Sequence, residues 1–263
     1  MKLASVFTAE LRRGLRRMWA YRYDTLGEMA LWLVAFPVML AIFSDVSGSY
    51  GPEQRLASLI GFLVWDLSMG VLTGMAQEVV RESREGTLES IMLSPWHPRT
   101  VFSVRFAAAF VVQGLRTLVL GLVLLAVLRL PLSFTGSAPI LLLLTILGVA
   151  GVGLALAGLT LVHKNLESVV GIAALLAVLF TGALVPLNAL GPVYEILKYL
   201  IPTTWGIDSL REVIINGASL TSLMADGTIL GLSLQAAAFL GLGVVVFGRS
   251  FRQAQLQGSL GSY

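Results

Sequence analysis

The sequence predicts an all-α membrane protein with six transmembrane helices, built as a single transmembrane domain over residues 1–263. Its composition supports this fold class, because 56% of the residues are hydrophobic, only 13% are charged and the mean hydropathy is +0.84. Soluble domains carry about 25% charged residues, and a soluble chain of this length would still need a polar surface. The other observation is a set of six apolar stretches, each near the ~20 residues that a helix needs to cross a bilayer.

The six stretches lie at roughly 26–46, 56–78, 101–128, 138–162, 168–188 and 224–247. A transmembrane β-barrel would instead show segments of about ten residues with alternating polarity. The run ILLLLTILGV at 140–149 does not alternate, so helices are predicted. The fourth stretch carries Gly148, Gly151, Gly153 and Gly158, whose lack of side chains favours close packing against another helix.

The distribution of positive charge predicts the orientation. If the N-terminus is cytoplasmic, 13 of the 18 Lys and Arg residues lie in cytoplasmic termini and loops, four lie outside, and Arg116 lies within a span. Because Lys and Arg concentrate in cytoplasmic loops, we expect a multi-pass protein of the cytoplasmic (inner) membrane with both termini in the cytoplasm.

Residues 1–24 predict a helix that lies in the plane of the lipid headgroups. Apolar residues such as Leu3, Phe7 and Leu11 recur at helical spacing. Such a helix places its apolar face in the membrane and its basic side chains near lipid phosphates. It either only anchors the topology or also contacts a cytoplasmic partner. The basic residues on its other side are Arg12, Arg13, Arg16 and Arg17.

A short charged segment, REGTLESIMLSPW at 84–96, separates the second and third stretches. Gly86 permits a change of chain direction, and Thr87 can cap a new helix. Ser94 and Pro95 then end that helix. The sequence therefore predicts a helix of about two turns in the loop on the cytoplasmic side.

This short helix has an apolar face formed by Leu88, Ile91 and Met92. Two turns are too few for a helix to be stable alone in water. The ends of the second and third spans, or a protein that docks from the cytoplasm, must therefore hold it. An ordinary solvated loop would not need the apolar face.

Two charged residues, Asp66 and Arg116, lie deep within the second and third stretches. Counted from Leu56 and Leu128, both lie roughly 15–18 Å from the outer surface at about 1.5 Å per residue. An isolated charge at that depth costs several kcal/mol, so we expect an ion pair between them. The pair is either structural or part of a polar wall that faces substrate, and Gln113 can extend it.

Prolines and glycines interrupt the chain after the fifth stretch, over residues 186–217. Broken helices at membrane depth are tolerated only where protein or a water-filled cavity surrounds them. Asp208 and Arg211, three residues apart, can form an ion pair on one helical face.

The run EGTLESIMLSP resembles the signature of the ABC-2 type permeases, the membrane subunits of a class of ATP-driven exporters. In that family the Glu-Gly-Thr-Leu-Glu run opens a coupling helix (here 84–95), which inserts into a groove of the ATPase subunit. The resemblance implies an ATPase interface at Arg84, Glu85, Gly86, Thr87, Leu88, Glu89, Met92, Ser94 and Pro95.

The resemblance continues over 184–217, where the family has a proline-broken outer segment and an Asp-x-x-Arg helix. Ile201 stands where asparagine is usual. The resemblance implies an extracellular gate, whereas a plain external loop on the headgroups is the alternative. The predicted gate residues are Pro186, Pro192, Pro202, Trp205, Asp208 and Arg211.

The sequence has no G-x-x-x-x-G-K-[ST] motif, so ATP and Mg²⁺ would bind a separate partner chain and this chain would be no enzyme. With no cysteine and two histidines, disulfides, thiolate sites and histidine-rich metal clusters are excluded, and we expect no cofactor. The implied partners are an ABC-type ATPase, a second copy or related permease, and membrane lipids, with no nucleic acid.

The expected cargo is a hydrophobic or amphipathic molecule, such as a drug, a lipid or a lipid-linked glycan, moved out of the cytoplasm. An ion-coupled secondary transporter that uses Asp66 is the alternative, although such transporters normally show paired broken helices. The aromatic residues of the spans are too scattered in the sequence to decide between substrates. They are Trp32, Phe36, Phe43, Phe62, Trp65 and Phe180.

Overall fold

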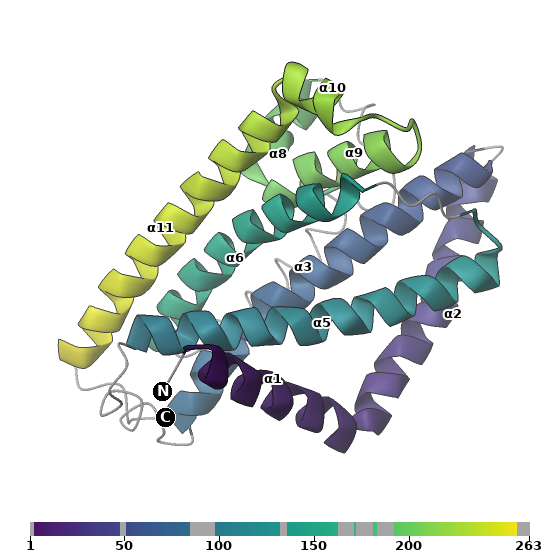
Figure 1. Ribbon diagram of the computed structural model, residues 1–263. Helices are drawn as coiled ribbons and strands as arrows, with labels where there is room; N and C mark the ends of the chain where they lie inside the picture. Colours follow the sequence, from purple (N-terminus) through teal and green to yellow (C-terminus); the bar gives the residue numbers. More distant parts are fainter. Residues whose placement is uncertain are drawn as a thin grey trace.

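The computed structural model describes residues 3–47, 51–84, 98–131, 136–162, 171, 181–182 and 192–256 (Figure 1). Within these ranges every helix is α-helical and no strand occurs, so the all-α prediction is confirmed for them. The helices are α1 (Leu3–Ala20), α2 (Arg22–Ser47), α3 (Pro52–Arg84), α5 (Pro98–Leu128), α6 (Ala138–Val162), α8 (Pro192–Leu200), α9 (Pro202–Ile214), α10 (Leu220–Ala225) and α11 (Thr228–Leu256).

Five described helices are long and apolar enough to cross a membrane. Their candidate spans are Arg22–Ile42, Pro52–Glu82, Thr100–Leu128, Ala138–Val162 and Thr228–Leu256. These correspond to the first, second, third, fourth and sixth predicted spans. The predicted fifth span, 168–188, lies outside the described residues except at Gly171, Thr181 and Gly182, so the count of six stays a prediction.

The last span begins later than the apolar pattern predicts. The expected range was 224–247, whereas α11 runs from Thr228 to Leu256. The preceding residues form α10, where the Ser219 hydroxyl accepts a hydrogen bond from the Ser222 backbone N–H at 3.2 Å. Gly227 then takes a φ of +72°, which glycine adopts without steric cost, and this turn separates α10 from α11.

Helix α3 is the central helix of the bundle. Inside the protein, 72% of its candidate span is buried, against 11% for α2 and 17% for α11. The α3 span also has the lowest hydropathy of the five, and its buried side chains include Asp66, Ser68 and Glu82. Polar side chains in membrane spans face the protein interior, which explains why the least apolar span lies at the centre.

Helices α6 and α11 pack closely through glycines, as the smooth face of the fourth stretch predicts. A Cβ atom at Gly151 would collide with the backbone of Phe239, and one at Gly243 would collide with the backbone of Gly151. Gly158 likewise faces the backbone of Phe247. The absence of side chains lets the two backbones approach and gain dispersion contacts along their length.

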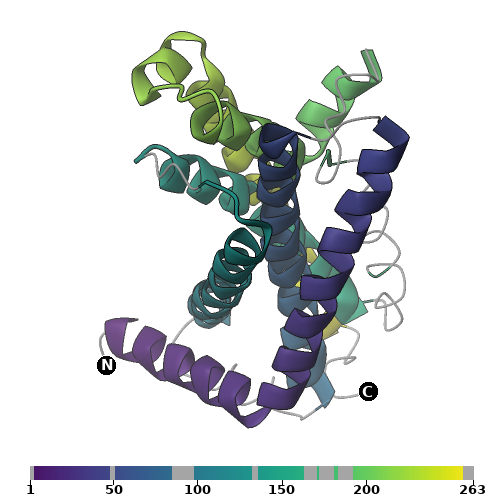
Figure 2. The ribbon, with the colours of Figure 1, turned by 90° about the vertical axis from the view of Figure 1, so that its right-hand side faces the viewer.

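The bundle has two different ends. Helix α1, the last turn of α3 and the first turn of α5 lie at one of them, called the α1 end here (Figure 1). Helix α1 runs across this end and α2 rises from its C-terminal side (Figure 2). Helices α8, α9 and α10 gather at the opposite end, the α9 end.

Candidate functional site

The predicted coupling segment, 84–95, lies outside the described residues apart from Arg84, the last residue of α3. The structure nevertheless describes both of its flanks, since α3 ends at Arg84 and α5 begins at Pro98. What these two flanks contact therefore determines how a movement of the segment would reach the bundle.

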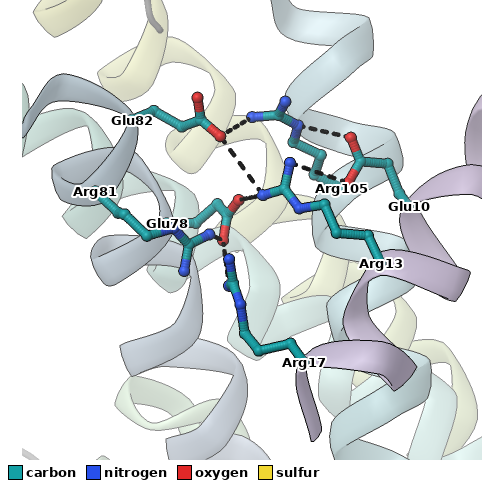
Figure 3. Close-up of polar contacts among 7 residues, drawn as sticks. All are labelled: Glu10, Arg13, Arg17, Glu78, Arg81, Glu82 and Arg105. Carbon is teal, nitrogen blue, oxygen red and sulfur yellow. Dashed lines mark hydrogen bonds and ion pairs between the residues drawn. The ribbon is translucent and has the colours of Figure 1, made fainter. Parts of the chain in front are cut away.

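The flanks carry a network of ion pairs with α1, which we call the α1 clamp (Figure 3). Arg13 of α1 lies 2.5 Å from Glu78 and 3.5 Å from Glu82, both on α3. Arg105 of α5 lies 2.5 Å from Glu82 and 3.0 Å from Glu10 of α1. The members of the clamp are Glu10, Arg13, Arg17, Glu78, Arg81, Glu82 and Arg105.

Helical spacing brings these residues to facing surfaces. In α1, residue 13 follows residue 10 by three positions and residue 17 follows residue 13 by four. In α3, residues 81 and 82 follow residue 78 by three and four positions. Each set therefore lies on one helical face. The centre of the clamp is buried, since Glu82 is 3% exposed and the Arg105 side chain 13%, whereas the side chains of Arg13 and Arg17 are 39% and 42% exposed. Breaking a buried pair by removing one partner typically costs about 3–5 kcal/mol, so the clamp resists separation of its three helices.

The clamp changes the interpretation of the arginines of α1. All four were expected to face lipid phosphates, but Arg13 and Arg17 instead face Glu78 of α3. Arg12 and Arg16 remain exposed. The reason is the docking of α1 on the bundle, where Gly14 brings its backbone against Val112 of α5.

The apolar residues of α1 include exposed Leu3, Leu15 and Trp19. Exposed apolar side chains on a docked helix are typical of a surface that contacts lipid. Helix α1 thus offers one face to the bundle and another to its surroundings.

Asp66 and Arg116 lie together in the middle of the bundle. An Arg116 guanidinium nitrogen is 3.6 Å from the Asp66 carboxylate, and Thr117 donates a hydrogen bond of 2.6 Å to the same carboxylate. Arg116 also donates to Glu28 of α2 at 2.7 Å. Glu28 is not among the predicted site residues. It falls within the first predicted span, where an acidic residue indicates a candidate functional site.

These charges line a cavity of about 640 Å³ bordered by α2, α3, α5 and Gly171, which we call the polar chamber. Gln113 contributes its amide and packs against Gly70, where a Cβ atom would collide with the Gln113 side chain. The principal side chains that line the chamber are Glu28, Trp32, Trp65, Asp66, Gln113 and Arg116.

Trp32 and Trp65, which line the chamber, belong to a cluster of aromatic residues that are far apart in the sequence. Trp32 and Trp65 meet edge to face with ring centroids 5.5 Å apart, and Trp32 lies 5.1 Å from Phe62. Phe36 stacks on Phe62 at 4.7 Å. Four aromatics that the sequence leaves scattered therefore form one cluster between α2 and α3.

At the α9 end, Arg211 is a buried anchor that also lies close to Asp208. Its side chain donates 2.9 and 2.7 Å hydrogen bonds to the backbone carbonyls of Ala57 and Gly182. Asp208 lies 3.6 Å from Arg211 and accepts a hydrogen bond from Tyr194 of α8. Burial raises the pKa of Asp208 above its ordinary value, and the Tyr194 hydrogen bond and the positive charge of Arg211 oppose that rise.

The other predicted gate residues take different positions. Pro192 and Pro202 begin α8 and α9, where the fixed φ of proline suits the first turn of a helix. Trp205 packs against Tyr199 with centroids 5.3 Å apart, and Lys198 lies 5.2 Å above its ring. Pro186 lies outside the described residues.

Among the described residues, no group of three or more His, Asp or Glu side chains could hold a metal ion. Sequence comparison adds a family to this geometry. The sequence model of the family described as ABC-2 type transporter matches residues 5–215. That range includes the clamp, the charged segment, the Asp66–Arg116 pair and α9. A comparison with curated proteins gives no match.

Proposed function

Because the chain belongs to the ABC-2 type transporter family, we propose that it is the membrane-spanning permease subunit of an ATP-driven exporter. A separate ABC-type ATPase, which binds ATP and Mg²⁺, docks on the segment 84–95 at the cytoplasmic face. Two permease subunits, either two copies of this chain or this chain and a related one, enclose the path. Their substrate is a hydrophobic or amphipathic molecule that leaves the cytoplasm.

The position of the α1 clamp is the observation that carries this proposal. Glu82 lies just before the charged segment and Arg105 about two turns after the start of α5, and they lie 2.5 Å apart. A force applied to the segment would thus reach α3 and α5 as a unit, and α1 with them. An ordinary loop between two spans would not need a buried network of charges at its base.

Helix α3 extends this connection to the α9 end. Its 33 residues span about 50 Å at 1.5 Å per residue, and its first turns accept the hydrogen bond from Arg211 of α9. A movement of the clamp would therefore be passed along one central helix to α9. This arrangement supports an extracellular gate in the segment 186–217.

Copurification with a co-expressed ABC-type ATPase tests the proposal. The variant Glu89→Arg places a positive charge in the segment and should reduce the ATPase retained by the chain at least tenfold, because charge reversal at a docking surface costs several kcal/mol. Glu53→Arg, the same substitution at the exposed start of α3, is the matched control and should retain the complex.

The proposal is supported if Glu89→Arg loses both transport and the complex while Glu53→Arg keeps both. Full retention of the ATPase by Glu89→Arg, with unchanged export, would contradict a docking role for the segment.

A further inference from the structure

The polar chamber has the size and position of a binding site. Its volume of about 640 Å³ falls within the range of about 300–1,000 Å³ that is typical of small-molecule sites. It extends from Asp66, near the middle of α3, to Glu28 and Gln77, each about two turns from the α1 end. The chamber thus lies in the half of the bundle nearest the coupling segment.

Among the described residues that line the chamber, the charges do not balance. Two carboxylates, of Glu28 and Asp66, face one guanidinium, of Arg116. Arg116 contacts both carboxylates and Thr117 donates to Asp66, but neither contact supplies a second positive charge. Because the Glu28 side chain is half exposed, the surroundings can solvate part of this negative charge. The remaining excess of carboxylate still favours a bound cation over a bound anion.

The aromatic wall adds to this preference. Trp32 and Trp65 both line the chamber, and the faces of indole rings attract cations by about 0.5–2 kcal/mol.

Small residues keep the chamber open. At Gly74, which lines it, an added Cβ atom would meet no heavy atom within 4 Å. A larger side chain at this position would therefore project into free space without displacing the backbone. The same is true of Gly241, an exposed residue on α11 outside the chamber.

We propose that the polar chamber binds a lipophilic organic monocation. The cationic group lies beside the two carboxylates and the two tryptophans that line the chamber. This inference rests on the exporter function proposed above and specifies its substrate class. An organic anion would meet the excess carboxylate, and a neutral molecule would leave that charge uncompensated.

Fluorescence anisotropy of a matched pair of dyes tests this chemistry on the full chain in lipid nanodiscs, with empty nanodiscs as the blank. Rhodamine B ethyl ester is a lipophilic monocation, whereas rhodamine B has the same rings with a free carboxylate and no net charge. The wild-type chain should bind the ester at least tenfold more tightly, because only the ester neutralises the chamber.

Two chamber variants and two controls sharpen the experiment. Glu28→Gln balances the charges at a half-exposed residue and should weaken binding of the ester about tenfold, whereas Glu53→Gln should not. Gly74→Leu should weaken binding of the ester by projecting into the chamber, whereas Gly241→Leu should not.

Equal binding of the two dyes, no binding of either above the blank, or full binding by Gly74→Leu would overturn the inference. No ATPase is present in this experiment. A failure of the inference would therefore leave the copurification result standing, and a failure of copurification would not remove the binding of the ester.

Discussion

The α1 clamp and the polar chamber are built from the same residue types but differ in what they leave open. In the clamp, three glutamates and four arginines from three helices pair with one another, and Glu82 at its centre is almost fully buried. In the chamber, one arginine serves two carboxylates beside a cavity of about 640 Å³.

This difference indicates two uses of charge in one bundle. Charges that are paired between helices and buried, as Glu82 and Arg105 are, hold helices together, and their loss lowers stability. Charges that are left unbalanced beside free space are available to a ligand. Substitutions in the clamp should therefore mainly change stability and coupling, and the half-exposed acid of the chamber should mainly change binding.

The largest expected effect is that of Arg105→Gln in the clamp. This change leaves Glu82 and Glu10 without their partner on α5 and should lower the free energy of unfolding by about 3–5 kcal/mol. Thermal unfolding in detergent, followed by tryptophan fluorescence, measures it.

Arg12→Gln is the matched control, because Arg12 is an exposed arginine of α1 and should change stability by less than about 0.5 kcal/mol. Adding Glu82→Gln to Arg105→Gln should recover part of the loss, since the buried glutamate is then uncharged. Equal melting temperatures for Arg105→Gln and Arg12→Gln would show that the clamp does not hold the helices together.

A smaller loss is expected from Arg116→Leu in the chamber. With Asp66 intact, the change leaves a buried carboxylate that keeps only the hydrogen bond from Thr117, and about 2–3 kcal/mol should be lost. Glu28→Gln should cost much less, because its side chain is 50% exposed. Wild-type expression, melting temperature and transport in Arg116→Leu would count against the ion pair.

The sequence predicts the contact between Asp66 and Arg116 better than it predicts the clamp. Both residues lie on consecutive spans, so their depths can be counted from the helical rise alone. The clamp depends on where α1 docks, and no local pattern distinguishes Arg13, which pairs with α3, from exposed Arg12. The second span is also predicted to end near residue 78, whereas α3 continues to Arg84. Glu82 therefore lies on a part of the helix that the apolar pattern does not predict.

The chamber could be predicted only in part for the same reason. Asp66 and Arg116 stand out because they are charges within apolar stretches. Glu28 belongs to the chamber through its contact with Arg116, a residue 88 positions away in the sequence. The sequence predicts that the last span begins at 224, whereas α11 begins at Thr228, because a hydropathy pattern does not show the turn at Gly227. The sequence predicts which side chains share a face of one helix, but it does not predict how distant helices dock.

Site-directed thiol labelling tests the central proposal, that an ATPase binds the segment after α3 from the cytoplasm. The chain has no cysteine, so Ser90→Cys introduces a single thiol in that segment and Glu53→Cys a single thiol at the start of α3. A membrane-impermeant maleimide should label Ser90→Cys in inside-out vesicles only, and bound ATPase should protect it, whereas Glu53→Cys should react only in right-side-out vesicles. Labelling of Ser90→Cys from the outside, or labelling that a bound ATPase does not slow, would contradict the account.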